Sequence, residues 1–326
     1  MGELGVALIG YGHWGPNLAH SLKAVEGARL RAVCVRTEGG AAAVAAALPG
    51  VQATTDLGRV LDRSDVEVVV VATPAPTHVE LARSALLAGK HVLVEKPLAT
   101  SLAEAEDMTK LAAARGRTLM VGHEYVYHPV VRRLAELLAA GDLGEVVCVS
   151  SERTNPTGTP ADRSVLWNLA PHDLSIVVHL LGADARRVGA RSPGRAPAGA
   201  EELVFLTIEL ASGALVEVQL SWIAPAKTRR MTFTGSAVIA VFDELAAESL
   251  ELFARRDGEP PARLEVSPPA AVEPLRAQWE ELVAALRDGR EPVTGVRHAL
   301  AVQRLADAAV RSLARGGAPV APSREP

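Results

Sequence analysis

Residues 10–15, which read Gly-Tyr-Gly-His-Trp-Gly, limit the fold of this chain more than any other segment. They match G-x-G-x-x-G and lie between an apolar run, Leu4–Ile9, and a helical pattern that begins at Pro16. In such a unit the first glycine permits a tight turn, the second lets the backbone approach a pyrophosphate, and the third lets helix and strand pack closely. The helix N-terminus also favours an anion. We therefore predict a dinucleotide-binding fold. The residues expected around the cofactor are Gly10, Tyr11, Gly12, His13, Trp14 and Gly15.

Strand and helix signals alternate over the first 120 or so residues. Four further apolar runs indicate strands, at 30–35, 66–72, 91–94 and 118–122. The second of these is rich in valine and almost continuous, which is typical of a parallel strand covered on both faces. Capping-box sequences begin at Thr77 and Ser101, each with a glutamate three residues later. The pattern predicts a doubly wound Rossmann-type α/β domain over residues 1–122.

A different pattern begins at about residue 144. Val216, Val218 and Leu220 alternate with polar residues, as in a strand that buries only one face. Several such segments in succession indicate a mainly antiparallel sheet. Strands are expected at Leu203–Leu210, 216–222, 228–234, 237–242 and Leu250–Ala254. Helical patterns occur at 129–140, 172–181, 274–287 and 296–315, and a loop is expected at 191–200.

These segments predict a second, α+β domain over residues 123–326, built on an open and mainly antiparallel sheet. Its last helix, 296–315, is a candidate to pack back on the first domain. An open sheet with helices on one face leaves its other face uncovered. Pairing two such faces is a common way to form oligomers, so we expect a homodimer or homotetramer.

Composition excludes several other classes of protein. The 326 residues are 48% hydrophobic with a net charge of −4, which gives no reason to expect a nucleic-acid or membrane partner. No apolar run reaches the roughly 18 residues of a membrane span, and the first ten residues lack the basic region of a secretory signal. The cysteines, Cys34 and Cys148, and the remaining histidines show no metal-type spacing, so no metal is expected. A cytoplasmic location is the default.

The end of the second predicted strand bears on the choice of cofactor. Arg36 and Thr37 follow this strand, and no acidic residue occurs before Glu38. An acidic residue there usually binds the ribose hydroxyls of NAD(H), whereas an arginine can meet the 2′-phosphate of NADP(H). We therefore predict NADP(H) as the preferred cofactor and NAD(H) as the alternative, in which case Arg36 is merely solvated.

Two polar segments follow the fourth and fifth strands of the first domain. The first contains Thr73, Pro74 and His78, and the second reads Glu95-Lys96-Pro97. Open α/β sheets bind ligands at the carboxyl ends of their strands, so both segments are expected at the cofactor crevice. Only five of the 34 basic residues are lysines, and a lysine can share a substrate proton, which a guanidinium cannot. Lys96 is therefore a candidate catalytic residue.

A third segment reads Asn168-Leu169-Ala170-Pro171-His172-Asp173. Pro171 suits the first turn of a helix that runs to about residue 181. If the chain is already helical at Asn168, then Asn168 and His172 lie on one face of it. Histidine is the usual proton carrier near neutral pH, whereas Asp173 is expected to serve only the helix N-terminus. Taken alone, His172 would more often be a structural residue.

Together these segments resemble the Gfo/Idh/MocA family of NAD(P)-dependent oxidoreductases over nearly the whole chain. The resemblance rests on residues 10–15, 72–78, 95–97 and 168–173. It implies that Lys96 and His172 flank the substrate beside the nicotinamide, and that the Lys96–Pro97 bond is often cis. Many polyol-oxidising members carry aspartate where this chain has Asn168, and asparagine cannot take a proton. The segment around His172 looks most similar to that of members acting on sugar nucleotides, including ketoreductases of deoxysugar pathways.

The reaction implied is hydride exchange between NADP(H) and a carbinol or ketone carbon of a sugar or nucleotide sugar. His172 would take the hydroxyl proton and Lys96 would stabilise the alkoxide, and both would donate in reduction. The residues expected to contact the substrate are Tyr125, Arg153, Asn155, Asn168 and His172. A free polyol such as an inositol is the alternative substrate. A catalytically silent dinucleotide-binding sensor is the alternative function, and a methyltransferase is a poorer one, since it leaves the second domain without a role.

Overall fold

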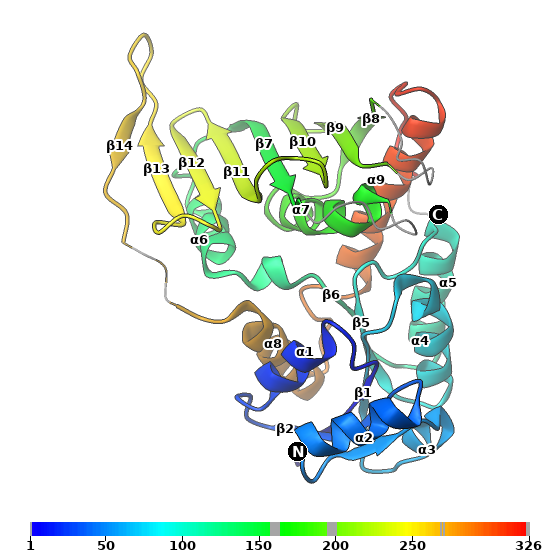
Figure 1. The fold of residues 1–326 in the computed structure, drawn as a ribbon. Helices are drawn as coiled ribbons and strands as arrows, with labels where there is room; N and C mark the ends of the chain where they lie inside the picture. Colours follow the sequence, from blue (N-terminus) through cyan, green and yellow to red (C-terminus); the bar gives the residue numbers. More distant parts are fainter. Residues whose placement is uncertain (1, 157–163, 194–200, 268, 270, 324–326) are drawn as a thin grey trace. The chain divides into compact units, whose positions relative to one another are not determined.

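The computed structural model describes residues 2–156, 164–193, 201–267, 269 and 271–323 (Figure 1). The chain divides into two compact units. The first comprises Met1–Tyr127 and Val272–Gln303, and the second comprises His128–Ala271 and Arg304–Pro326. A single boundary after residue 122 was predicted, and the division differs from it at residues 123–127 and at Val272–Gln303.

A six-stranded parallel sheet forms the centre of the first unit. Its order is β3-β2-β1-β4-β5-β6, the doubly wound order in which the chain starts at the middle and builds outward in both directions. This confirms the predicted Rossmann-type fold. The strands are β1 (Leu4–Ile9), β2 (Ala28–Cys34), β3 (Gln52–Thr54), β4 (Val68–Val71), β5 (His91–Glu95) and β6 (Leu119–Gly122). The three-residue β3 lacks an apolar run and was not predicted.

Helices connect these strands. They are α1 (Gly15–Leu22), α2 (Glu38–Ala47), α3 (Leu57–Leu61), α4 (His78–Leu87) and α5 (Leu102–Ala114), with short 3₁₀ turns at Ala75–Thr77 and Glu124–Tyr127. The predicted cap at Ser101 is confirmed, because its hydroxyl accepts from the Glu104 amide and contacts the Glu104 carboxylate. The predicted cap at Thr77 is wrong. Its hydroxyl instead contacts the Pro74 carbonyl and the Thr73 hydroxyl, each at 2.7 Å, and so closes the turn before α4.

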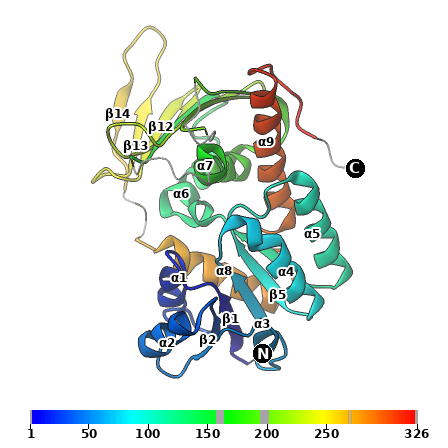
Figure 2. The same cartoon turned by 45° about the vertical axis from the view of Figure 1, so that its right-hand side comes forward.

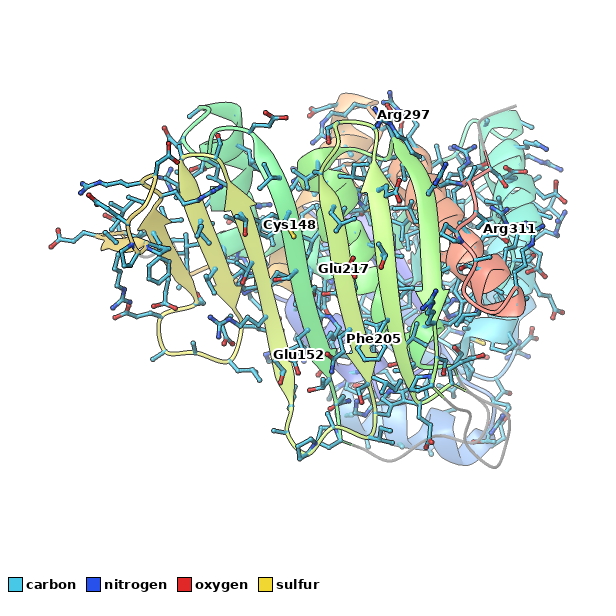
Figure 3. The ribbon with its side chains drawn as sticks, turned by 90° about the horizontal axis from the view of Figure 1, so that it is seen from above. Cys148, Glu152, Phe205, Glu217, Arg297 and Arg311 are labelled. Carbon is cyan, nitrogen blue, oxygen red and sulfur yellow. The ribbon has the colours of Figure 1, made fainter. Side chains whose placement is uncertain are left out.

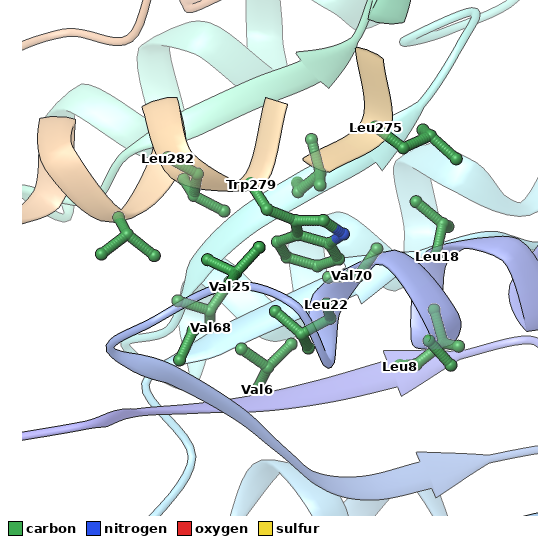
Figure 4. Close-up of a cluster of buried hydrophobic side chains, with 14 of the residues drawn as sticks. Val6, Leu8, Leu18, Leu22, Val25, Val68, Val70, Leu275, Trp279 and Leu282 are labelled. Atoms are coloured by element: carbon green, nitrogen blue, oxygen red, sulfur yellow. The ribbon is translucent and has the colours of Figure 1, made fainter. Parts of the chain in front are cut away.

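Helix α8 (Pro274–Asp288) belongs to the first unit because its apolar face packs on α1 and the central strands. Trp279 is buried within this cluster, and its indole N–H donates to Ser21 Oγ at 3.0 Å (Figure 4). The chain thus returns, after some 250 residues, to complete the core of its first domain. This helix was instead predicted to belong to the second domain, residues 123–326. The cluster also includes Val6, Leu8, Leu18, Leu22, Val25, Val68, Val70, Leu275 and Leu282.

An eight-stranded sheet forms the second unit, in the order β14-β13-β12-β11-β7-β10-β9-β8. Only β7 and β10 pair in parallel, so the prediction of a mainly antiparallel sheet is confirmed. The strands are β7 (Val146–Thr154), β8 (Ala185–Arg191), β9 (Leu203–Leu210), β10 (Leu215–Ser221), β11 (Thr228–Gly235), β12 (Val238–Asp243), β13 (Leu250–Ala254) and β14 (Ala262–Leu264). Strands β7, β8 and β14 were not predicted. Arg191, assigned to a loop, ends β8, and residues 194–200 lie outside the described part of the chain.

Helices α6 (Pro129–Ala139) and α7 (Val165–Leu181) lie on one side of this sheet (Figure 2). Helix α9 (Val296–Ala314) is divided, since its residues to Gln303 belong to the first unit and the rest to the second. The opposite face of the sheet carries Cys148, Glu152, Phe205 and Glu217 (Figure 3). Among them Phe205 is 44% exposed. The predicted open face is therefore present in the described structure.

Helix α7 starts earlier than predicted. The Ser164 hydroxyl accepts from the Leu166 amide and caps the helix, which then runs from Val165 through Pro171 without interruption. Proline was expected in the first turn, where its missing N–H costs nothing, but Pro171 lies six residues after Val165, inside the helix, and is buried. Asn168 is consequently helical. Asn168 and His172, four residues apart, therefore share one helix face.

Candidate active site

The three motif glycines lie in different surroundings, and at two of them a side chain would clash with the backbone. Gly10 has φ of +97°, and a Cβ there would lie 2.6 Å from the Ala72 carbonyl oxygen at the end of β4. A Cβ on Gly15 would lie 2.7 Å from the Gly10 carbonyl oxygen, so this residue sets the close packing of α1. Gly12 faces open space within 4 Å, which leaves its backbone accessible to a ligand. The loop therefore fits the pyrophosphate of a dinucleotide.

Trp14 links the glycine loop to the end of β5. Its indole N–H donates to Glu95 Oε1 at 3.1 Å. Glu95 is paired with Gly122 in the β5–β6 register, and a Cβ on Gly122 would lie 2.8 Å from Glu95 Oε1. The carboxyl group thus occupies the space left by an absent side chain. Burial, followed by the negative charge of Glu124, raises the pKa of Glu95 to about 8, and the Lys96 charge opposes this rise.

Lys96 begins the turn that leaves β5, and its peptide bond to Pro97 is cis. The positive charge of Lys96 lowers the pKa of two histidines on neighbouring segments. His78 is buried at the start of α4, and burial lowers its pKa with a smaller contribution from Lys96. His123 directly follows β6, and burial, then His298, then Lys96 lower the pKa of His123 well below its usual value. Lys96 thus lies among several titratable groups at the carboxyl edge of the parallel sheet.

His123 and His298 form a contact that the sequence analysis missed, since it treated both as ordinary histidines. Their Nδ1 atoms are 3.2 Å apart, and their rings meet edge to face. Thr294 ties the segment before His298 to β6, because its backbone carbonyl accepts from the Val121 amide and its hydroxyl donates to the Val121 carbonyl. Tyr127 adds a hydroxyl contact to Thr294 at 2.9 Å. No local signal in the sequence connects residues separated by about 170 positions.

The end of β2 carries the residues assigned to cofactor choice. Arg36 is exposed, and Thr37 caps α2 by accepting from the Gly40 amide at 3.1 Å. Glu38, the first acidic residue after the strand, accepts from the Thr55 hydroxyl at 2.6 Å. The described structure thus leaves an exposed guanidinium, and no acid directly after β2, at the position that contacts the adenosine ribose in this fold.

In the second unit, Asp173 has a role different from the one predicted. It lies in the middle of α7, where its carboxylate accepts from Arg153 Nε at 2.6 Å and from the Ser151 hydroxyl at 2.8 Å. Arg153 and Asp173 are only 3% and 1% exposed. The pair therefore joins α7 to β7 inside the unit. The prediction that Asp173 serves the helix N-terminus is wrong, because the helix begins eight residues earlier.

The other predicted substrate residues are partly buried in the described structure. Asn168 and His172 lie on α7. Asn155 directly follows β7, and its backbone N–H donates to the Ser221 carbonyl at the end of β10. Tyr125 lies in the 3₁₀ turn after β6, in the first unit. Arg153 is committed to its buried ion pair, which makes it a structural link as well as a substrate candidate.

Comparison with known proteins agrees with this arrangement. A model described as "Oxidoreductase family, NAD-binding Rossmann fold" matches residues 4–123, and one described as "GFO/IDH/MocA C-terminal domain" matches residues 131–240. The fold and the glycine loop therefore define an NAD-binding oxidoreductase of the Rossmann type. Together the two models cover most of the chain, and it belongs to the Gfo/Idh/MocA family.

Its relatives differ in substrate. The chain is 28% identical to 4-carboxy-2-hydroxymuconate-6-semialdehyde dehydrogenase of Sphingobium sp. over 92% of this chain and 96% of that protein. It is 33% identical to inositol 2-dehydrogenase 4 of Saccharopolyspora erythraea over 67% of each. A solved structure of UDP-N-acetylglucosamine 3-dehydrogenase from Acidithiobacillus ferrooxidans is 25% identical, with a TM-score of 0.84 and coverage of 97% and 99%.

Two features are absent from the described residues. No helix there is long and apolar enough to cross a membrane. No group of three or more histidine, cysteine, aspartate or glutamate side chains in those ranges is arranged to hold a metal ion.

The raised pKa of Glu95 gives a testable dependence of stability on pH. Because the folded-state pKa of about 8 exceeds the usual value of 4.5, the folded state holds a proton that the unfolded state has lost between these pH values. We expect the unfolding free energy of the wild type to fall, relative to Glu95→Gln, as pH rises from about 4.5 to 8. Urea unfolding at several pH values measures this difference, and a constant difference across that range would contradict it.

Proposed function

We propose that this protein is an NADP(H)-dependent oxidoreductase that exchanges a hydride with a carbinol or ketone carbon of a sugar or nucleotide sugar. The observation that carries the proposal is the position of Lys96 at the carboxyl end of β5. There it lies one residue beyond the glutamate that Trp14 of the glycine loop contacts, and among the buried histidines His78 and His123. A lysine, unlike an arginine, can share a proton with a substrate oxygen.

In the proposed reaction Lys96 and His172 act on the same substrate oxygen. During oxidation the His172 imidazole takes the hydroxyl proton, and the Lys96 ammonium stabilises the developing alkoxide. During reduction the new alkoxide takes a single proton, which one of the two groups supplies while the other donates a hydrogen bond to the same oxygen. The bound cofactor supplies or accepts the hydride. Asn168 cannot take a proton, so its role is to hold a substrate hydroxyl next to His172, one helical turn away.

Substitution of Lys96 tests this scheme. We expect Lys96→Met to reduce kcat by about 10²–10⁴-fold, because one proton-transferring and charge-stabilising group is lost. Lys96→Arg, which keeps the charge without a transferable proton, should remain impaired. Cofactor affinity, followed by fluorescence titration, should change little in either variant. His20→Asn, at an exposed position of α1, serves as the matched control. Unchanged turnover in Lys96→Met would remove this lysine from the mechanism.

The substrate class is best assigned with the wild-type protein. The segment around His172 is similar to that of nucleotide-sugar enzymes, and the solved relative acts on UDP-N-acetylglucosamine. The inositol dehydrogenase relative supports a free polyol instead. A panel of UDP- and dTDP-linked sugars beside free inositols and hexoses, with NADP⁺ and NADPH, decides between them. Tight cofactor binding without turnover on any compound would favour a silent sensor.

The proposed preference for NADP(H) rests on Arg36 and Thr37. We expect Arg36→Ala to raise the KM for NADPH about tenfold, because one charge-assisted contact with the 2′-phosphate is lost. The KM for NADH should hardly change, since NADH lacks that phosphate. Steady-state kinetics with both cofactors give the two values. An equal effect on both cofactors, or none on either, would show that the guanidinium is only solvated.

We also propose that the open face of the second unit binds a second copy of the chain. It carries the exposed Phe205, and Glu152 and Arg230 are register partners on β7 and β11. A surface with an apolar side chain and both charges can complement itself about a two-fold axis. We expect Phe205→Glu to lower the molar mass in light scattering relative to wild type, with Arg83→Glu, at an exposed position of α4, as a surface control. An unchanged mass would exclude Phe205 from the contact.

A further inference from the structure

His78 contacts two loops at once. It is 1% exposed and forms the first residue of α4. Its Nδ1 lies 2.7 Å from the Pro97 carbonyl oxygen, and its Nε2 lies 2.8 Å from the Thr73 carbonyl oxygen. Pro97 follows Lys96 after β5, and Thr73 follows β4, the neighbouring parallel strand. The imidazole therefore bridges the two loops that leave adjacent strands at the carboxyl edge of the sheet.

The chemistry of these contacts depends on the protonation of the ring. A carbonyl oxygen can only accept a hydrogen bond, and a neutral imidazole has a single N–H to donate. A neutral His78 would therefore leave one ring lone pair facing a carbonyl oxygen at hydrogen-bond distance. The imidazolium has two N–H groups and satisfies both carbonyls. A complete bridge between Thr73 and Pro97 thus requires the cationic ring.

Lys96 opposes that cation. Burial of His78 and the charge of Lys96 lower the pKa of the ring, whereas the contacts with Pro97 and Thr73 raise it. Lys96 is the charged group whose field acts on the ring, and the two carbonyl oxygens are the hydrogen-bond partners that face it. Two neighbouring cations at a buried site are unfavourable, so protonation of either group makes protonation of the other harder.

We propose that His78 is a positioning residue for Lys96, because its ring contacts the Pro97 carbonyl next to Lys96 and the Thr73 carbonyl on the neighbouring loop. The bridge fixes the turn that carries Lys96 against the loop that carries Thr73. The Lys96 charge disfavours the cationic ring, so removing that charge should make the complete bridge easier to form. The proposal rests on the catalytic role given to Lys96 under the proposed function. It also differs from the direct cofactor contact expected for His78, because both ring nitrogens face backbone carbonyls in this structure.

Histidine-detected NMR tests the coupling without relying on activity. In protein labelled with ¹⁵N-histidine, the His78 ring signals are identified by their loss in His78→Asn and followed across the pH range. We expect the pKa of His78 to be higher by about one unit in Lys96→Met than in wild type, because the opposing charge is gone. The cationic ring should show two protonated nitrogens. Equal titration in the two proteins would overturn the proposal, and Lys96→Met keeps His78 in place even if His78→Asn folds poorly.

Kinetics separate positioning from simple structural support. We expect His78→Asn to lower kcat about tenfold or more and to shift the pH dependence of kcat, because the Lys96 turn and its charge environment both change. His91→Asn is the matched control, since His91 lies partly buried at the opposite end of β5 and accepts from the Thr118 amide. A purely structural role would lower Tm without shifting the pH profile, and that result would overturn the proposal. Full turnover in Lys96→Met would instead contradict the proposed function.

Discussion

The parallel pairing of β4, β5 and β6 is the constraint on which the first unit's chemistry depends. The register sets Val71 beside Val94 and Glu95 beside Gly122, so three chain segments leave the sheet at one edge. Side chains that are far apart in sequence become neighbours there without any specific attraction between them. Burial of the valines of β4 and β5, which fill both faces of the sheet, stabilises the strands that end at this edge. The polar groups at the edge are therefore not needed to stabilise the sheet and can serve the reaction.

Features encoded by local spacing were predictable from the sequence. The glycine loop, the valine-rich strands and the segment containing Lys96 all carry short-range signals, and the structure has them where those signals lie. The contacts that the sequence could not reveal join distant positions. Trp279 with Ser21 and His298 with His123 depend on the chain's return to its first domain, which no local pattern records. Strand β7 was missed because Ser151 and Arg153 take two of the alternating buried positions, and only Val149 there is apolar.

Those two polar residues explain a second feature of the candidate site. Removing the partner of a buried charge typically costs about 3–5 kcal/mol, so Arg153 and Asp173 are stable only together. Their ion pair ties the middle of α7 to β7. His172 directly precedes Asp173, so the backbone that carries the proposed base is anchored by a contact of its neighbour. The sequence showed the motif but not this link, because the pairing depends on which face of α7 meets the sheet.

Because lysine is scarce in this chain, Lys96 was considered a catalytic candidate. Lys90 shows that scarcity alone is weak evidence for this role. This lysine is also retained, yet its ammonium donates to the Arg63 and Val66 carbonyls at 2.7 and 2.8 Å and so fastens the entry to β4. A compact cation suits that buried position better than a planar guanidinium. A lysine in this chain can therefore serve a structural role, as Lys90 does, or a role in proton transfer, as proposed for Lys96. What separates Lys96 from Lys90 is its surroundings. Lys90 lies among backbone carbonyls and nearby acids, whereas the charge of Lys96 acts on two buried histidines and on a carboxyl group whose pKa is raised by burial.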